Sequence, residues 1–339
     1  MAEAPKENAA GPENVAAKLA ILIALLAALS FVLVHFNIVS CGFYSSFGCD
    51  VYYSLTAGGK PKILIVHGDE GMGDPEFLFN TLRGPKFSAR VEIKEMELVS
   101  LPVLNEYQLV VVEKAAEMKT SELKMFQEYV ARGGKLVWIG NAGTRAQESE
   151  ADENYFLREK DREVSGSEEF ISPWARREGN RQVSFDLLLG VNFKANYCDI
   201  EECPKSGEAE LTGFFDFIDQ DERIVYGLSQ SLPFYGNFSI VELNSDAFQK
   251  NLAFLDYGTD LIGEPHPLGG EYFWLKGGKL DFGKSFPIIV SSGVGNRVLY
   301  YAFPPEFFVS DSMPVDKKTG EKTRYWALIE NMYYGMLYK

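Results

Sequence analysis

The chain has 339 residues, 46% of them hydrophobic, and carries 33 lysines and arginines against 48 aspartates and glutamates, a formal net charge of -15. This length is enough for one large domain or two modest ones, with a sizeable core. The acidic balance argues against a nucleic-acid binder and against an anionic-membrane binder, because both need a basic face.

The hydrophobic residues are concentrated near the N-terminus. The 21 residues Leu19–Val39 contain only Ser30, His35 and Asn37 as polar residues. As a helix they span roughly 31 Å, enough to cross a hydrocarbon core of about 30 Å. We therefore expect a disordered tail over residues 1–18, a transmembrane helix over residues 19–39 that contacts membrane lipid, and one large C-terminal body.

The basic residues around this span predict its orientation. Lys18 directly precedes the span, and the first basic residue after it is Lys60. The positive-inside rule then places the N-terminus in the cytoplasm and the body outside it.

The four cysteines fall into two short-range pairs, which predict the disulfides Cys41–Cys49 and Cys198–Cys203 in an oxidising compartment. A zinc site is the rival interpretation, although the spacing is wrong and no histidine lies near either pair. A cleaved leader is a second alternative, because Ile38–Cys41 resembles a bacterial lipobox that would lipidate Cys41. The long, acidic stretch before the span argues against such a leader.

The body begins after a disulfide-tied stalk over residues 40–60, and its first half alternates short apolar strands with helices. The predicted elements are a strand at Ile63–Val66, a helix capped by Asp74 with Pro75 at its first position, strands near Val91–Leu98 and at Leu109–Val112, a helix at Ser121–Arg132, and a strand at Lys135–Ile139. This alternation predicts an α/β fold, a flavodoxin-like, doubly wound and mostly parallel sheet.

A charged insertion over residues 144–182 interrupts the pattern, and we interpret it as solvated, with a lid or docking arm as the alternative. The half that follows is rich in strands. Its predicted strands are Phe185–Leu189, Leu211–Ile218, Phe238–Leu243, Tyr272–Leu275, Phe286–Val290 and Arg297–Phe303, followed by a helix at Lys322–Leu337. Two prolines end the last strand, and we expect the aromatic segment Pro304–Phe308 to be exposed.

Three motifs, in this order along residues 61–339, resemble the class I glutamine amidotransferase-like fold, and in particular its ThuA-like and non-catalytic membrane-anchored branches. The motifs are Lys62–Val66 with His67-Gly68, the run Phe126–Gly134 followed by Lys135–Gly143, and Gly295–Phe303 followed by Leu328–Leu337. Each motif is generic, and their order carries the resemblance.

The resemblance also implies that the catalytic residues of that family are missing. Catalytic members carry a cysteine nucleophile on the sharp turn after the strand, where backbone N–H groups stabilise an oxyanion. Here the turn is Ile139-Gly140-Asn141-Ala142-Gly143, so Asn141 stands at the nucleophile position. The family's His-Pro-Glu is replaced by His266-Pro267-Leu268. We therefore expect no catalytic residues of the amidotransferase type and no cofactor.

Polar residues after the first strand form a second candidate site. His67, Asp69, Glu70 and Asp74 follow that strand, and ligands of open α/β sheets bind beyond the carboxyl ends of the strands. A histidine among carboxylates can hold a metal or transfer protons, whereas the plainer interpretation is a polar loop with a helix cap. We keep His67, Asp69, Glu70 and Asn141 as candidate ligand-binding residues, with no metal assigned.

Three functional hypotheses follow. The first is a membrane-anchored, extracytoplasmic pseudoenzyme that binds protein partners as a scaffolding subunit of an envelope complex. The second is a carbohydrate-binding or carbohydrate-processing protein, because ThuA-like relatives are associated with sugar metabolism. The third is a metal-dependent hydrolase at the end of the first strand. Asn237, in Asn237-Phe238-Ser239, is a candidate glycosylation site.

Overall fold

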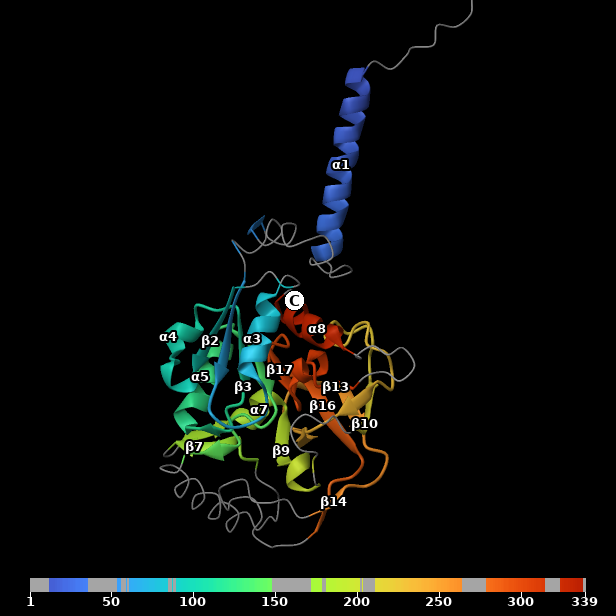
Figure 1. Ribbon diagram of the computed structural model, residues 1–339. Coiled ribbons are helices and arrows are strands. Elements are labelled where there is room, and N and C mark those ends of the chain that lie inside the picture. The colour runs from blue at the N-terminus through green and yellow to red at the C-terminus, as the bar shows by residue number, and fades with distance from the viewer. Residues whose placement is uncertain are drawn as a thin grey trace, which may run out of the picture.

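The computed structural model (Figure 1) describes residues 12–35, 54–55, 59, 61–84, 87, 90–147, 172–178, 181–201, 203, 211–263, 279–314 and 324–337. Several predictions lie outside these residues. They are the Cys41–Cys49 disulfide, most of the stalk, the His266-Pro267-Leu268 segment and the strand at Tyr272–Leu275.

The N-terminal helix α1 runs from Pro12 to His35, so it begins before the predicted span. Its window Ala16–Leu33 is long and apolar enough to cross a membrane, and none of that window is buried inside the protein. By length and composition, this helix, which no described part of the chain buries, is suited to span a bilayer.

Nine strands of the body form one mixed sheet in the order β11-β10-β13-β16-β17-β5-β3-β1-β2. Their bounds are β1 Lys62–His67, β2 Arg90–Glu95, β3 Leu109–Glu113, β5 Lys135–Ile139, β10 Leu211–Phe217, β11 Pro233–Tyr235, β13 Gln249–Asp256, β16 Ser285–Ser292 and β17 Val298–Tyr301.

Helices and short strand pairs complete the body. The helices are α3 Pro75–Arg83, η2 Met96–Leu98, α4 Leu101–Leu104, α5 Thr120–Ala131, α7 Phe185–Leu189, η3 Tyr197–Asp199, η4 Pro305–Val309 and α8 Trp326–Leu337. The pairs are β4 Glu117–Met118 with β6 Arg145–Ala146, β7 Ala175–Glu178 with β8 Arg181–Ser184, β9 Val191–Asn196 with β12 Ser239–Leu243, and β14 Ile262–Gly263 with β15 Leu280–Asp281.

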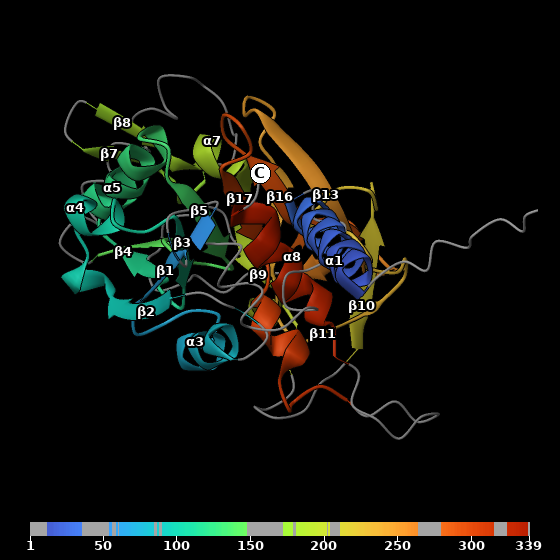
Figure 2. The same cartoon turned by 90° about the horizontal axis from the view of Figure 1, so that it is seen from above.

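The half of the sheet from β2 to β17 is parallel throughout. Its order, β2-β1-β3-β5-β17, matches the 2-1-3-4-5 order of flavodoxin-like folds. From β1 the chain moves to β2 on one side and then to β3 on the other, so helices cover both faces. Figure 2 shows α3 and α8 on one face, and α4 and α5 on the other. The α/β prediction is confirmed for this half.

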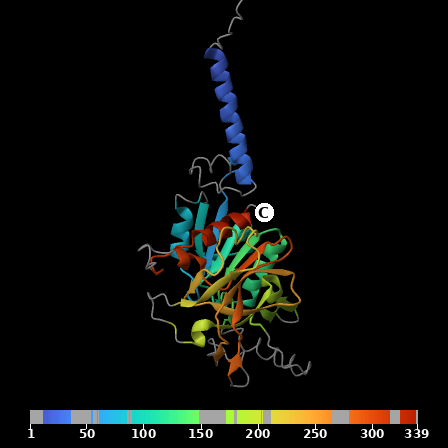
Figure 3. The same ribbon diagram turned by 90° about the vertical axis from the view of Figure 1, so that its right-hand side faces the viewer.

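The other half of the sheet is an antiparallel wing in which β16, β13, β10 and β11 follow β17. Figure 3 views the molecule from the side of this wing. Because half of the strand pairings are antiparallel, the sheet is mixed and not mostly parallel as predicted. The parallel half alone keeps the crossover pattern that places side chains at the carboxyl ends of its strands.

The segment Phe185–Leu189, predicted as a strand, is the helix α7, so that prediction is wrong. Phe185 and Leu189 are buried, whereas Leu187 between them is exposed, as expected for residues four apart on one helical face. Gly190 ends the helix with φ +76°, and a Cβ there would lie 2.6 Å from Cβ of Gln249. Only glycine fits this cap.

One further expectation about exposure is wrong. Pro305, Glu306 and Phe308 of the segment Pro304–Phe308 are buried, because this segment forms η4 and packs on α8. Ser172 and Trp174, at the described end of the charged insertion, are also buried. Most of the insertion lies outside the described residues, so its solvated interpretation stays a prediction.

The Cys198–Cys203 disulfide is present and confirms one of the two predicted pairs. It ties down the chain that follows η3. The side chain of Asn237 supports the same turn, because its Oδ1 accepts a hydrogen bond of 3.1 Å from the Cys198 N–H. Glycosylation of Asn237 stays a prediction.

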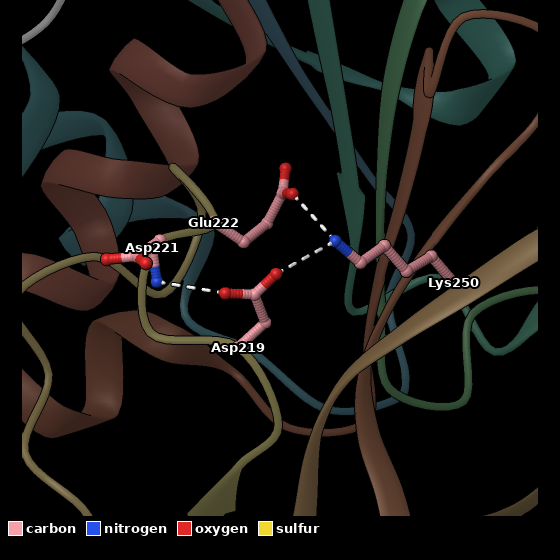
Figure 4. A network of polar contacts seen from close by, with 4 residues as sticks. All are labelled: Asp219, Asp221, Glu222 and Lys250. Atoms are coloured by element: carbon pink, nitrogen blue, oxygen red, sulfur yellow. Dashed lines mark hydrogen bonds and ion pairs between the residues drawn. The ribbon is translucent and has the colours of Figure 1, made fainter.

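A polar network fixes the connection after β10 to the wing (Figure 4). Lys250 of β13 forms ion pairs with Asp219, at 3.4 Å, and Glu222, at 2.9 Å, and Asp219 also accepts a hydrogen bond from the Asp221 N–H. These side chains are partly exposed, so each pair stabilises the fold by no more than about 1 kcal/mol. The network orders a surface connection and does not form a site.

Candidate functional site

The candidate site lies where the chain changes direction across the sheet, at the carboxyl ends of β1 and β3. His67 ends β1, Glu113 ends β3, and these two residues are paired in register. Because β1 continues to β2 on one side and β3 lies on the other, this is the switch point at which open α/β sheets bind ligands.

The loop after β1 is held tightly against the chain after β3. The N–H of Gly68 donates to Lys114 O, the N–H of Lys114 donates to Met72 O at 2.7 Å, and the N–H of Ala116 donates to Glu70 O at 2.7 Å. These backbone bonds fix the loop like a further strand pairing. The loop is therefore a rigid cover over the strand ends.

The candidate residues of this loop do not converge on one point. His67 donates from Nδ1 to Gly68 O at 3.0 Å, Asp69 is exposed, and Glu70 forms an ion pair with Arg145. Among the residues that the structure describes, no group of three or more His, Cys, Asp or Glu has the geometry of a metal site. The site's described residues thus offer no ligand set for the metal-dependent hydrolase considered above.

Asn141, on the turn after β5, acts as a clamp between this turn and the loop. Its side chain is only 7% exposed, and Oδ1 accepts a hydrogen bond of 3.0 Å from the Met72 N–H. Gly71 has φ +125°, and a Cβ there would lie 3.1 Å from the same oxygen. The Asn141 amide thus satisfies a backbone donor of the loop, at the position where the resemblance expects a nucleophile.

The end of the charged insertion holds the same turn from the other side. Arg176 is 2% exposed, and its guanidinium donates to Gly143 O at 2.7 Å and to Met118 O at 2.5 Å. The indole of Trp174 donates to Ala142 O at 2.8 Å. Sequence reasoning missed this contribution, because an arginine in a charged run looks solvated when its acceptors are backbone carbonyls 33 and 58 residues away in the chain.

Two buried glutamates form the core of the site, and sequence reasoning missed both. Glu113 is 0% exposed and Glu306, on η4, is 2% exposed. Glu306 Oε1 accepts a hydrogen bond of 2.9 Å from the Asp74 N–H. Both oxygens of Glu113, and Oε2 of Glu306, accept no hydrogen bond from the described part of the chain. Two sequence signals could have indicated their burial. Glu113 directly follows the apolar run Leu109–Val112, and Glu306 stands between two prolines and two phenylalanines.

The loop backbone lies close to the Glu113 carboxyl group at Gly73. Gly73 has φ +121°, and a Cβ at this position would lie 2.5 Å from Glu113 Oε2. The glycine brings the loop backbone directly onto the carboxyl group. Asp74 follows at once as the N-cap of α3, where its side chain accepts from the Phe77 N–H at 3.0 Å. The N-cap of α3 therefore lies directly beside Glu113 and Glu306.

Burial decides the charge of this pair. Burial raises the pKa of Glu113 well above its ordinary value, and the negative charge of Glu306 raises it further. Burial also raises the pKa of Glu306 to about 7, while the Asp74 N–H lowers it by stabilising the charged form. Two carboxylates this close in a dry site cannot both ionise near neutral pH without a large penalty, so the pair retains a proton.

No family model matches the chain, and no curated protein matches it. Solved structures with a related arrangement include a ThuA-like protein from Bacteroides uniformis, with 16% identity and TM-score 0.47, covering 81% of this chain and 91% of that one. A glutamine amidotransferase from Thermotoga maritima has 11% identity and TM-score 0.35, covering 73% and 76%. The mmIFT52 N-terminal domain has 11% identity and TM-score 0.42, covering 81% and 96%.

We expect Asn141→Ala to destabilise the body by about 1–3 kcal/mol, because the Met72 N–H is then buried without an acceptor. Denaturant unfolding of the full-length protein in mild detergent measures this change. Asn105→Ala, at an exposed asparagine after α4, is the matched control and should change stability by less than about 0.5 kcal/mol. Equal effects of the two substitutions would contradict the clamp.

Proposed function

We propose that this protein is a membrane-anchored, non-catalytic member of the class I glutamine amidotransferase-like proteins, and that its body serves as a binding or scaffolding subunit of an envelope protein complex. One observation carries the proposal. The residue at the nucleophile position, Asn141, is buried, and its amide oxygen accepts a hydrogen bond from the Met72 N–H. An asparagine amide is not a nucleophile, and the oxygen of this one serves as a structural clamp.

The order of the elements supports the family part of the proposal. The three motifs that carry the resemblance fall on β1 with its loop, on α5 followed by β5, and on β17 followed by α8. These strands belong to the parallel half of the sheet, and the clamped turn directly follows β5.

The helix α1 supports the anchored part. None of its apolar window Ala16–Leu33 is buried inside the protein, and Ala20, Ala24 and Ala28 recur at a spacing of four residues. Small residues at this spacing allow close packing between transmembrane helices. The helix is therefore suited to contact a partner helix within the bilayer as well as lipid.

The observed disulfide supports an extracytoplasmic body, because such bonds persist in oxidising compartments. We expect Cys198 and Cys203 to resist alkylation in intact cells until a reductant is added. Non-reducing electrophoresis after thiol labelling measures this. As the control, Cys198→Ser should expose the thiol of Cys203 to the reagent. Free thiols at both positions in the native protein would place the body in the cytoplasm.

The scaffolding role predicts a stable complex in the native membrane. Purification in mild detergent, followed by native mass spectrometry, should recover the chain with one or more stoichiometric protein partners. A variant whose residues 12–35 are replaced by an unrelated transmembrane helix separates partners held by α1 from partners held by the body. Recovery of the native protein only as a lone monomer would refute the proposed role.

A further inference from the structure

The pair of Glu113 and Glu306 is a feature that a passive scaffold does not need. Three carboxyl oxygens in it are buried and accept no hydrogen bond from any residue that the structure describes. Buried carboxyl oxygens without donors are costly, and structures keep them where they serve a purpose. The missing donor is supplied if one carboxyl group carries a proton and donates it to the other.

A proton fits this site better than a metal ion does. Calcium requires six to eight oxygen ligands, and magnesium retains several waters. The two carboxyl groups are 0% and 2% exposed, and the described residues contain no metal-like group of three acidic, histidine or cysteine side chains. A single proton needs only two oxygens, and both are present.

The pair joins three segments that are distant in the sequence. Glu113 ends β3, Glu306 lies on η4, and the Asp74 N–H that binds Glu306 begins α3. The helix η4 also packs against α3 and α8. Its Phe308, 1% exposed, stacks on Tyr325 and accepts a backbone hydrogen bond of 2.9 Å from the Tyr325 N–H. Movement of η4 would uncover this aromatic contact.

We propose that Glu113 and Glu306 form a proton-operated latch, in which one shared proton holds η4 against the ends of β3 and α3, and loss of that proton releases η4. Release would expose Phe308 and its neighbours at the edge of the site as an apolar surface. The latch is independent of the scaffolding role, since it concerns motion within the body alone.

The charged and titratable groups around Glu113 and Glu306 favour the protonated, closed form of the pair. Asp74 adds a further negative charge, which opposes ionisation of both glutamates, and only the neighbouring Lys114 favours ionisation of Glu113. His67 is the register partner of Glu113 on β1, but its Nδ1 is engaged with Gly68 O. Raising the pH therefore leaves repulsion between the glutamates uncompensated.

The sign of the pH dependence follows from proton linkage. In the open form the two carboxyl groups are in water and ionise near their ordinary pKa, whereas the closed form retains a proton. Each opening event therefore releases one proton. The opening equilibrium constant should rise up to tenfold per pH unit above the ordinary glutamate range, and should level off once the closed form has lost its proton.

Hydrogen exchange of the full-length protein in mild detergent tests the latch. The protection factors of the Phe307, Ser310 and Tyr325 amides, corrected for intrinsic exchange, should fall up to tenfold per pH unit between about pH 5 and pH 7. Amides of β3 and β5 should change much less. Glu113→Gln removes one titrating group and leaves Glu306, whose pKa burial also raises, so the pH dependence of protection at these three amides should become weaker.

Two further variants keep the result interpretable. Glu117→Gln, at an exposed glutamate of β4, should behave like the native protein. Glu306→Gln, which keeps an acceptor for the Asp74 N–H, should weaken the pH dependence as Glu113→Gln does, and the double variant with both substitutions should abolish it. A native protein whose η4 protection is independent of pH would overturn the latch. So would protection that depends on added calcium or magnesium at constant pH, which would assign the pair to a metal ion.

Discussion

Two carboxyl groups that meet inside the protein, where the chain changes direction across the sheet, constrain the rest of this structure. Glu113 ends β3, Glu306 lies on η4, and neither is exposed by more than 2%. Gly73, at φ +121°, brings the loop backbone against Glu113, and the Asp74 N–H donates to Glu306. The loop after β1, the start of α3 and the segment after β17 are thereby fixed to one another.

The same constraint explains why this edge of the sheet is not an open crevice. The loop after β1 bonds to the chain after β3, and Asn141 closes the gap to the turn after β5. Arg176 and Trp174 hold that turn from outside. The position that supports ligands in many open α/β sheets is occupied here by the protein's own polar groups.

Elements with strong local signals could be predicted from the sequence. The buried strand β1, the cap of α3 by Asp74 and Pro75, and the Cys198–Cys203 pair each depend on residues close together in the chain. The sequence identified Asn141 as the residue at the nucleophile position of the resemblance, but it did not predict the hydrogen bond between Asn141 and the Met72 N–H.

The features that the sequence did not predict share one cause, because each depends on contact between segments distant in the chain. The five residues of α7 have no clear period, and their helix is fixed by packing and by Gly190. Glu306 and Arg176 looked solvated, because their partners are 232 and 33 residues away in the chain.

The protonation state of Glu113 is the central claim. Infrared spectra of the protein at neutral pH should show the C=O stretch of a buried protonated carboxyl group, absent from Glu113→Gln; carboxylate bands alone in the native protein would contradict this account.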